Sequence, residues 1–377
     1  MARFVRFRTF LRGKDRPIAM EAQWHSVCVL NGGTKFAWEL FSSLHLSSEP
    51  VMRVLLAHDS SQYSKAAAEY LLSMPFRKPI DLDVVCAVSP PVVVDSGTLG
   101  LPTDLGIFLT EECDAARSRL EESFAHLSSP FQSVQTHVPV GPPSTELLSV
   151  AQQTDADLVV LGAVGHSALQ RVLLGSVSDY VATHSDTTTL VVRPPHDASV
   201  QPKLGRIVVA LSGRADDERM IDWLRGLMLP ADVEVHLVRI LQLPTFYRED
   251  IRQKASNYWD GFVKEAQAHI LKLETTLQDM GLNTETHLVN AEHVGEGLIN
   301  YAEQHGCDLI MTGESDSGTL TRVFLGSTSR YVLRHAQCSV MIVRDKHVRQ
   351  AVKESAATES ATDEHSKPKA ARTWAVI

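Results

Sequence analysis

Cysteine is scarce in this chain, and the few cysteines are not grouped. The 377 residues hold five of them, Cys28, Cys86, Cys113, Cys307 and Cys338, and no two are spaced as C-x-x-C. A disulfide framework or a structural zinc site needs cysteines at short, regular spacings, so the sequence predicts neither. A reducing compartment, and therefore a cytoplasmic location, is the expectation.

Long apolar runs and a surplus of basic residues are also missing. Without a run of about 18 apolar residues, the sequence predicts no membrane-spanning helix and no membrane partner. The 36 basic and 45 acidic residues give a formal net charge of −9, which argues against a nucleic-acid partner because such binding needs a basic surface. The 16 histidines show no metal-ligand grouping, so no metal site is predicted. His184 and His335, at two predicted helix ends, are expected to meet main-chain carbonyls.

What the chain does have is a glycine-rich motif after an apolar run. Gly162-x-x-Gly165 follows the predicted strand 157–162 and is separated by nine residues from Gly175-Ser176. Glycines at a strand end allow positive φ and close approach of a ligand to the main chain. Gly175 and Ser176 open a predicted helix, whose first N–H groups favour an anion, and Ser176 is expected to cap it. The motif predicts a phosphate cradle, and an ordinary glycine loop is the alternative.

The motif recurs 151 residues later (313 − 162 = 151) with one substitution. The second copy reads Gly313-x-x-Asp316, nine residues, Gly326-Ser327. This repetition identifies an internal duplication, and the chain length also exceeds that of one typical domain. Asp316 replaces the second glycine and places a carboxylate in the cradle, where it would repel a polyphosphate. We therefore expect the second copy to be degenerate.

An acidic residue is expected at the same sheet edge as the first motif. Asp59 ends a short apolar strand predicted over 52–58. Loops that follow the carboxyl ends of parallel strands line the ligand crevice, so Asp59 and Gly162 should converge there. Its carboxylate suits a ribose or adenine donor group, although an aspartate at a strand end can also cap the next helix. In the second half Ser212 takes this position, and Glu314 adds a further negative charge.

In this order, these residues resemble the universal stress protein family, specifically its ATP-binding branch, over about residues 50 to 344. The resemblance implies an α/β fold of two tandem doubly wound parallel-sheet domains, Rossmann-like and similar to the adenine nucleotide alpha hydrolases. It also implies that ATP, with or without Mg²⁺, binds the first domain with its adenosine near Asp59 and the main chain of Val88. The implied phosphate-side residues are Leu161, Gly162, Gly165, Gly175, Ser176 and Val177, and the implied degenerate second site comprises Ser212, Gly313, Asp316, Gly326 and Ser327.

Apolar strands alternate with helical segments along both halves, which predicts right-handed crossovers. The predicted strands are 52–58, 82–88, 133–140, 157–162 and 188–193, then 205–211, 232–240, 284–290, 308–312 and 338–343. The predicted helices are 61–73, 109–127, 144–154 and 176–185, then 215–228, 250–280, 295–305 and 326–335. The predicted domains are a basic leader over 1–49, a first domain over 50–195, a linker over 196–204, a second domain over 205–345 and a disordered tail over 346–377.

Two further expectations concern the leader and the sheet edges. Phe36, Leu40 and Leu44 suggest a short amphipathic helix in the leader, whose basic composition fits a transit peptide, a basic arm or a surface-binding segment. The last strand of each half should lie at an edge, and exposed edges invite pairing. The resemblance implies an internal pseudo-dimer through these strands, or a homodimer of two chains.

The leading functional hypothesis is a stress-response protein in which a bound adenine nucleotide regulates conformation or partner binding. A slow ATPase or nucleotide hydrolase is the enzymatic alternative, with Asp59 as acid or base and His166 as charge stabiliser. A ligand-free scaffold is the third. Ser212-Gly213-Arg214 faintly resembles the phosphate loop of ATP pyrophosphatases, but Arg214 replaces a glycine that such a loop needs.

Overall fold

The structure is a computed structural model that describes residues 3–7, 25–29, 51–90, 103–125, 131–165, 174–194, 204–242, 249–314 and 325–345. The chain divides into one unit before Val51 and one from Val51 onward. In the first unit, β1 (Arg3–Phe7) pairs antiparallel with β2 (His25–Val29), a pairing that the sequence analysis did not predict. The helix expected around 36–44 lies outside the described residues.

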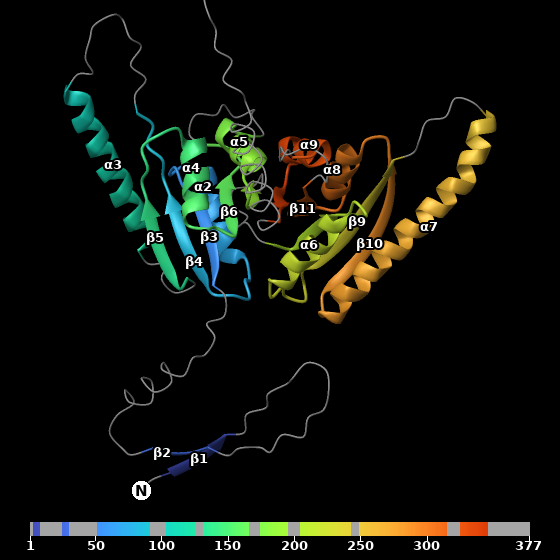
Figure 1. Cartoon of the computed structure of the whole chain (residues 1–377), viewed down its shortest axis with the longest axis horizontal. Helices are drawn as coiled ribbons and strands as arrows, with labels where there is room; N and C mark the ends of the chain where they lie inside the picture. Colours follow the sequence, from blue (N-terminus) through green and yellow to red (C-terminus); the bar gives the residue numbers. More distant parts are fainter. Residues whose placement is uncertain are drawn as a thin grey trace, which may run out of the picture. The chain divides into compact units, whose positions relative to one another are not determined.

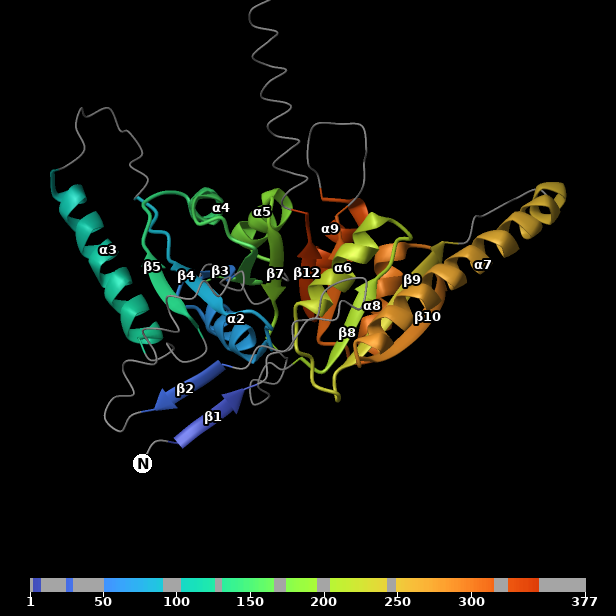
Figure 2. The same ribbon diagram turned by 60° about the horizontal axis from the view of Figure 1, so that its bottom comes forward.

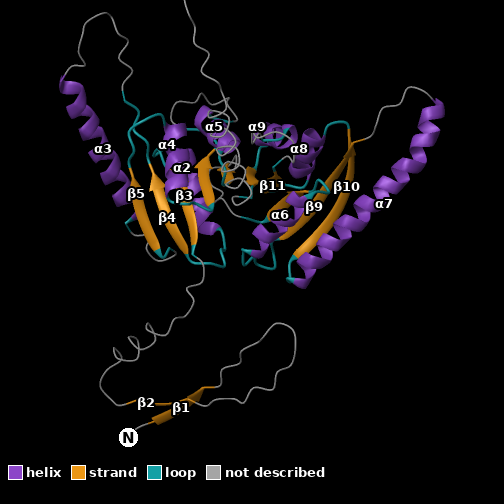
Figure 3. Ribbon diagram, in the orientation of Figure 1, coloured by secondary structure: helices purple, strands orange, loops and turns teal. Residues whose placement is uncertain are grey.

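The second unit contains two lobes with the same order of elements (Figures 1 and 3). The first lobe comprises β3 (Met52–Ala57), α2 (Gln62–Ser73), β4 (Ile80–Val85), α3 (Thr103–Phe124), β5 (Ser133–His137), α4 (Pro143–Gln153), β6 (Leu158–Gly162), α5 (Ser176–His184) and β7 (Thr188–Val192). The second comprises β8 (Arg206–Ala210), α6 (Ala215–Arg225), β9 (Glu234–Gln242), α7 (Glu249–Asp279), β10 (Asn283–Ala291), α8 (Val294–Gln304), β11 (Leu309–Gly313), α9 (Ser327–His335) and β12 (Ser339–Val343). The predicted fold class is confirmed, and the largest shift of a boundary is at α3, which begins at Thr103 rather than at residue 109. No helix within the described ranges is long and apolar enough to cross a membrane.

One ten-stranded sheet runs through both lobes in the order β10-β9-β8-β11-β12-β7-β6-β3-β4-β5. Within each lobe all neighbouring strands are parallel. The lobes meet at β7 and β12, which pair antiparallel with Met341 opposite Leu190 and lie side by side in Figure 2. These are the strands that the sequence analysis places at the sheet edges, and their pairing joins the lobes into the expected internal pseudo-dimer.

Alternate residues of the strands build two apolar cores, one on each face of the sheet. Val54 and Leu56 of β3 face one core, and Leu55 between them faces the other. Helices α2, α3, α6 and α7 supply the first core, whereas α4, α5, α8 and α9 supply the second. Because helices cover both faces of the sheet, the strands are nearly continuous apolar runs. Polar residues are therefore found at the strand ends.

Two buried arginines cross the joint between the lobes as a pair related by the duplication (344 − 193 = 151). Arg193 ends the first lobe and donates to the carbonyl of Leu333, 2.6 Å away in α9. Arg344 ends the second lobe and donates to the carbonyl of Ala182 in α5 and to that of Thr187 at 3.4 Å. Each lobe therefore supplies a cation that satisfies main-chain acceptors of the other, which stabilises the joint beyond strand pairing.

Candidate functional site

The carboxyl ends of β3, β4 and β6 border a cavity of about 430 Å³ in the first lobe. Its position follows from the topology, because β3 and β6 are adjacent and the loops after them face each other. Seven of the eight predicted first-site residues line this cavity: Asp59, Leu161, Gly162, Gly165, Gly175, Ser176 and Val177.

Asp59 lies directly over the second glycine of the motif. A Cβ atom added to Gly165 would be 2.9 Å from Asp59 Oδ2. The other carboxylate oxygen, Oδ1, accepts the Ser61 N–H at 3.0 Å, so the loop after β3 orients the side chain. A Cβ atom on Gly162 would be 2.7 Å from the main chain of Tyr63. Gly162 thus permits close packing of α2 on β6, and Gly165 leaves space beside the carboxylate.

The amino end of α5 points its main-chain N–H groups at the same loop. Gly175 is the N-cap and its N–H donates to the Ala163 carbonyl at 2.7 Å. The expectation that Ser176 caps this helix is wrong, because Ser176 is the first helical residue and is exposed. Ser178, not Ser176, reaches back, with its hydroxyl donating to the Gly162 carbonyl at 2.8 Å. Among the described residues no side chain caps α5, so its first-turn N–H groups are left for an anion.

Val88 is the predicted site residue that the structure does not bring to the cavity. Its N–H donates to the Pro139 carbonyl at 2.9 Å, and its own carbonyl accepts the Gly141 N–H at 3.0 Å. Both polar main-chain groups are therefore engaged with the loop after β5. Cys86 and Ala87, just before Val88, line the cavity instead.

His58 and Cys86 are two further wall residues, which the motif did not predict. His58 is 5% exposed, and burial lowers the pKa of its imidazole. Burial raises the pKa of the Cys86 thiol, so both groups are neutral near pH 7. Of the described residues that line the cavity, Asp59 then carries the charge. Both residues stand at strand ends, so the rule that placed Asp59 there would have found them. His166 lies outside the described residues.

The second lobe has a larger cavity, about 690 Å³, in the corresponding place. Ser212, Gly313, Gly326 and Ser327 line it, as the duplication predicts. Asp316 lies outside the described residues. Trp259 of the long helix α7 also lines this cavity. It was not predicted because it lies outside the glycine motif.

The charges of the second cavity differ from those expected from sequence. Arg214 and Arg239 both line it, and Arg239 was not predicted because it comes from the middle of β9. The carboxylate of Glu314 lies 3.9 Å from Nε of the buried Arg344, which offsets its negative charge. Asp216 also lines the cavity and pairs with Arg219, so two arginines and two paired carboxylates face the cavity among the described residues.

The side chain of Asp217, in the first turn of α6, binds the loop after β8 in a way that bears on the pyrophosphatase alternative. Its fully buried carboxylate accepts the N–H groups of Ser212 and Gly213 at 2.9 and 2.7 Å. A phosphate loop offers such N–H groups to its ligand. Here they are already bonded to a side chain of the protein, which argues against a pyrophosphatase-type loop.

Comparisons with known proteins agree with the fold and the duplication. A family model described as "Universal stress protein family" matches residues 50–193 and 203–344. A universal stress protein of Methanocaldococcus jannaschii is 28% identical over 148 residues, covering 38% of this chain and 82% of the relative. One from Mycobacterium tuberculosis is 22% identical over 300 residues, covering 78% of this chain and 98% of the relative. A crystal structure of a universal stress protein from Archaeoglobus fulgidus aligns with a TM-score of 0.53 at 17% identity, covering 78% of this chain and 96% of that one.

Proposed function

Because the chain belongs to the universal stress protein family, we propose that its first lobe binds an adenine nucleotide, with ATP as the leading candidate. The bound nucleotide regulates the conformation of the paired lobes or their choice of partner. The observation that carries this proposal is the meeting of Asp59, Gly165 and the uncapped amino end of α5 around one cavity of about 430 Å³.

The chemistry of the cavity walls favours one orientation of the nucleotide. The first-turn N–H groups of α5 and the positive end of its dipole attract the phosphates. Asp59 accepts hydrogen bonds and repels anions, so it suits the ribose hydroxyls or the adenine amino group. Cys86, Ala87 and Leu147 provide an apolar wall for the base. Adenosine therefore lies toward β3 and β4, and the phosphates lie toward β6 and α5.

Binding is favoured over turnover by the small number of acidic groups. Phosphoryl transfer relies on a metal ion held by carboxylates close to the β- and γ-phosphates. Of the described residues that line the first cavity, Asp59 supplies a carboxylate, and the proposed pose assigns it to the nucleoside. A slow ATPase is therefore the weaker candidate.

Native mass spectrometry of the full chain with added ATP tests the proposal directly. We expect one nucleotide bound per chain, in the first lobe. Two nucleotides per chain would mean that Arg214 and Arg239 make the second cavity competent despite Asp316. A chain that stays free of nucleotide at millimolar ATP would refute the proposal and favour a ligand-free scaffold.

Replacement of Asp59 by alanine should weaken ATP binding more than binding of inorganic triphosphate, because the proposed contact is to the nucleoside. Loss of a charge-assisted hydrogen bond is worth about 1.5–3 kcal/mol, or roughly 10- to 100-fold in affinity. Calorimetric titration with both ligands measures the difference. Ser212→Ala, at the matched position of the second lobe, should leave both affinities unchanged. Equal losses for the two ligands in Asp59→Ala would show that Asp59 does not contact the nucleoside.

A further inference from the structure

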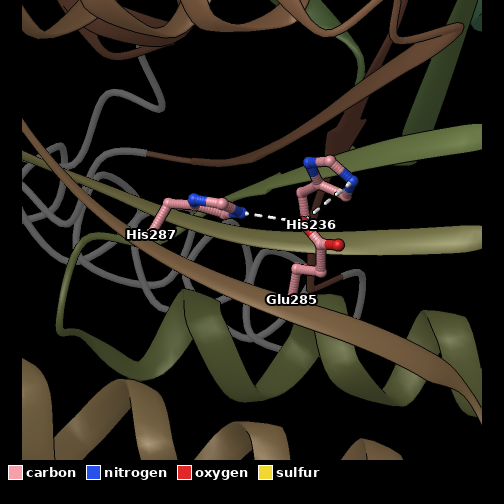
Figure 4. A group of neighbouring side chains, drawn as sticks. All are labelled: His236, Glu285 and His287. Atoms are coloured by element: carbon pink, nitrogen blue, oxygen red, sulfur yellow. Dashed lines mark hydrogen bonds and ion pairs between the residues drawn. The ribbon is translucent and has the colours of Figure 1, made fainter.

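Two histidines and a glutamate converge in the second lobe, away from its cavity. His236 lies near the start of β9, Glu285 near the start of β10, and His287 at the middle of β10. Register pairs His236 with Glu285, and all three side chains point toward one another in Figure 4. One ligand atom from each lies within 4.8 Å of the others. None of the three residues lines the second cavity, which reaches β9 through later residues such as Arg239.

His236 presents a buried nitrogen to this cluster. Its side chain is 3% exposed, and within the described part of the chain Nε2 has no hydrogen-bond partner. Its other nitrogen, Nδ1, is 2.7 Å from the hydroxyl of Tyr301 in α8. When Nδ1–H donates to Tyr301, Nε2 carries a lone pair and faces carboxylate oxygens, an arrangement that a cation would stabilise.

The ligand atoms lie near the spacing that a small divalent ion imposes, with His236 farther away than the other two are from each other. Zinc binds imidazole nitrogen and carboxylate oxygen at about 2.0–2.2 Å in a tetrahedron, which places neighbouring ligand atoms roughly 3.3–3.5 Å apart. Here His287 Nε2 lies 3.2 Å from Glu285 Oε2, and His236 Nε2 lies 3.9 Å from the same oxygen. The exposed Glu285 and half-buried His287 side chains are the two that would move toward His236 to close the set.

We propose that His236, Glu285 and His287 bind a divalent transition-metal ion of the zinc class. Two imidazoles and one carboxylate form a known three-ligand set for zinc that leaves a fourth position for water. Tyr301 is a positioning residue, because its hydroxyl engages Nδ1 of His236 and leaves Nε2 to bind the metal. This site does not depend on the nucleotide proposal, which concerns the first lobe.

The charges around the cluster are compatible with a cation. Glu234 Oε2 lies 3.5 Å from His236 Nε2, and the Arg206 guanidinium pairs with the same glutamate. The ring of His305 lies with its centre 5.9 Å from that of His236, while its Nδ1 is 2.8 Å from the Tyr301 carbonyl. Glu285 thus provides the ligand charge, and the Glu234–Arg206 pair is close to neutral.

The first lobe provides an internal comparison at the same register positions. There Asp83 pairs with Gln135 across β4 and β5, as His236 pairs with Glu285 across β9 and β10. The imidazole of His137, which corresponds to His287, is 2.6 Å from Asp83 Oδ1. Aspartate and histidine satisfy each other in that lobe, and glutamine provides no carboxylate. The metal-binding set is therefore a property of the second lobe alone among the described residues.

Titration of the full, metal-free chain with Co²⁺, a spectroscopic substitute for zinc, tests the site. We expect one Co²⁺ per chain, with visible d–d bands of four- or five-coordinate metal and no thiolate charge-transfer band. Glu285→Gln and His287→Ala each remove a partly exposed ligand and should weaken binding by about 100-fold or more. Tyr301→Phe should keep the shape of the spectrum and weaken binding by about 10-fold or more.

His335→Ala is the matched control. His335 stacks on Tyr331, four residues before it, as His305 stacks on Tyr301. His335 lies outside the cluster, so its loss removes a histidine without removing a ligand. It should bind Co²⁺ like the wild type. Circular dichroism confirms that each variant is folded, and Zn²⁺ should displace Co²⁺. The proposal is overturned if the wild type binds no stoichiometric Co²⁺, or if Glu285→Gln and His287→Ala both bind it as tightly as the wild type. In that case His287 and Glu285 form only an ordinary ion pair.

Discussion

Gly165→Asp is expected to abolish ATP binding while leaving the fold intact. The new side chain begins 2.9 Å from Asp59 Oδ2, and its carboxylate would stand in the loop that the proposal assigns to the phosphates. A carboxylate about 4 Å from a phosphate charge repels it by about 4 kcal/mol at an effective dielectric constant of 20, which corresponds to roughly 1000-fold in affinity. The substitution reproduces the residue found at Asp316 in the second copy of the motif. Calorimetric titration with ATP measures the loss.

Gly165→Asn separates charge from bulk, because asparagine has nearly the same shape as aspartate without the negative charge. It should bind ATP more tightly than Gly165→Asp, although more weakly than the wild type. Equal losses in the two variants would assign the effect to steric exclusion. If Gly165→Asp still bound ATP with the affinity of the wild type, the phosphates would not lie in this loop and the proposed site would be wrong.

The duplicated sequence predicted the fold in detail because each lobe is built from local patterns. Apolar runs of strand length alternate with amphipathic segments, and the sheet order follows from right-handed crossovers. The joint at β7 and β12 was also predictable, since an apolar edge strand needs a partner. The crossed arginines Arg193 and Arg344 were not, because their acceptors are main-chain carbonyls of the other lobe, which carry no sequence signal.

The candidate site was predictable where its residues stand at strand or helix ends. Asp59, Gly162, Gly165 and Gly175 belong to loops whose position the topology fixes. Val88 lies outside the cavity because β4 ends at Val85 and the main chain of Val88 is bonded to the loop after β5. The cluster of His236, Glu285 and His287 was not predicted from the sequence. Its members are brought together by the register between strands about 50 residues apart, not by spacing within one segment.

Arg344→Ala is expected to lower the free energy of unfolding by about 2–4 kcal/mol. Its side chain is fully buried, and its guanidinium donates to the carbonyls of Ala182 and Thr187 and to the hydroxyl of Thr189. A buried acceptor that loses its donor costs about 1–3 kcal/mol. Relief of the cost of burying a cation offsets part of this loss, whereas Glu314 loses its partner at 3.9 Å. Urea denaturation followed by circular dichroism measures the change.

Arg117→Ala provides the control for this measurement, because Arg117 pairs with Asp114 on the exposed surface of α3. Loss of such a pair costs less than about 1 kcal/mol. Arg193→Ala should destabilise the chain by an amount similar to Arg344→Ala, since the duplication places the two arginines in equivalent contacts with opposite lobes. If Arg344→Ala unfolded at the same urea concentration as Arg117→Ala, the crossed arginines would contribute nothing to stability, and the antiparallel pairing of β7 with β12 would hold the lobes together by itself.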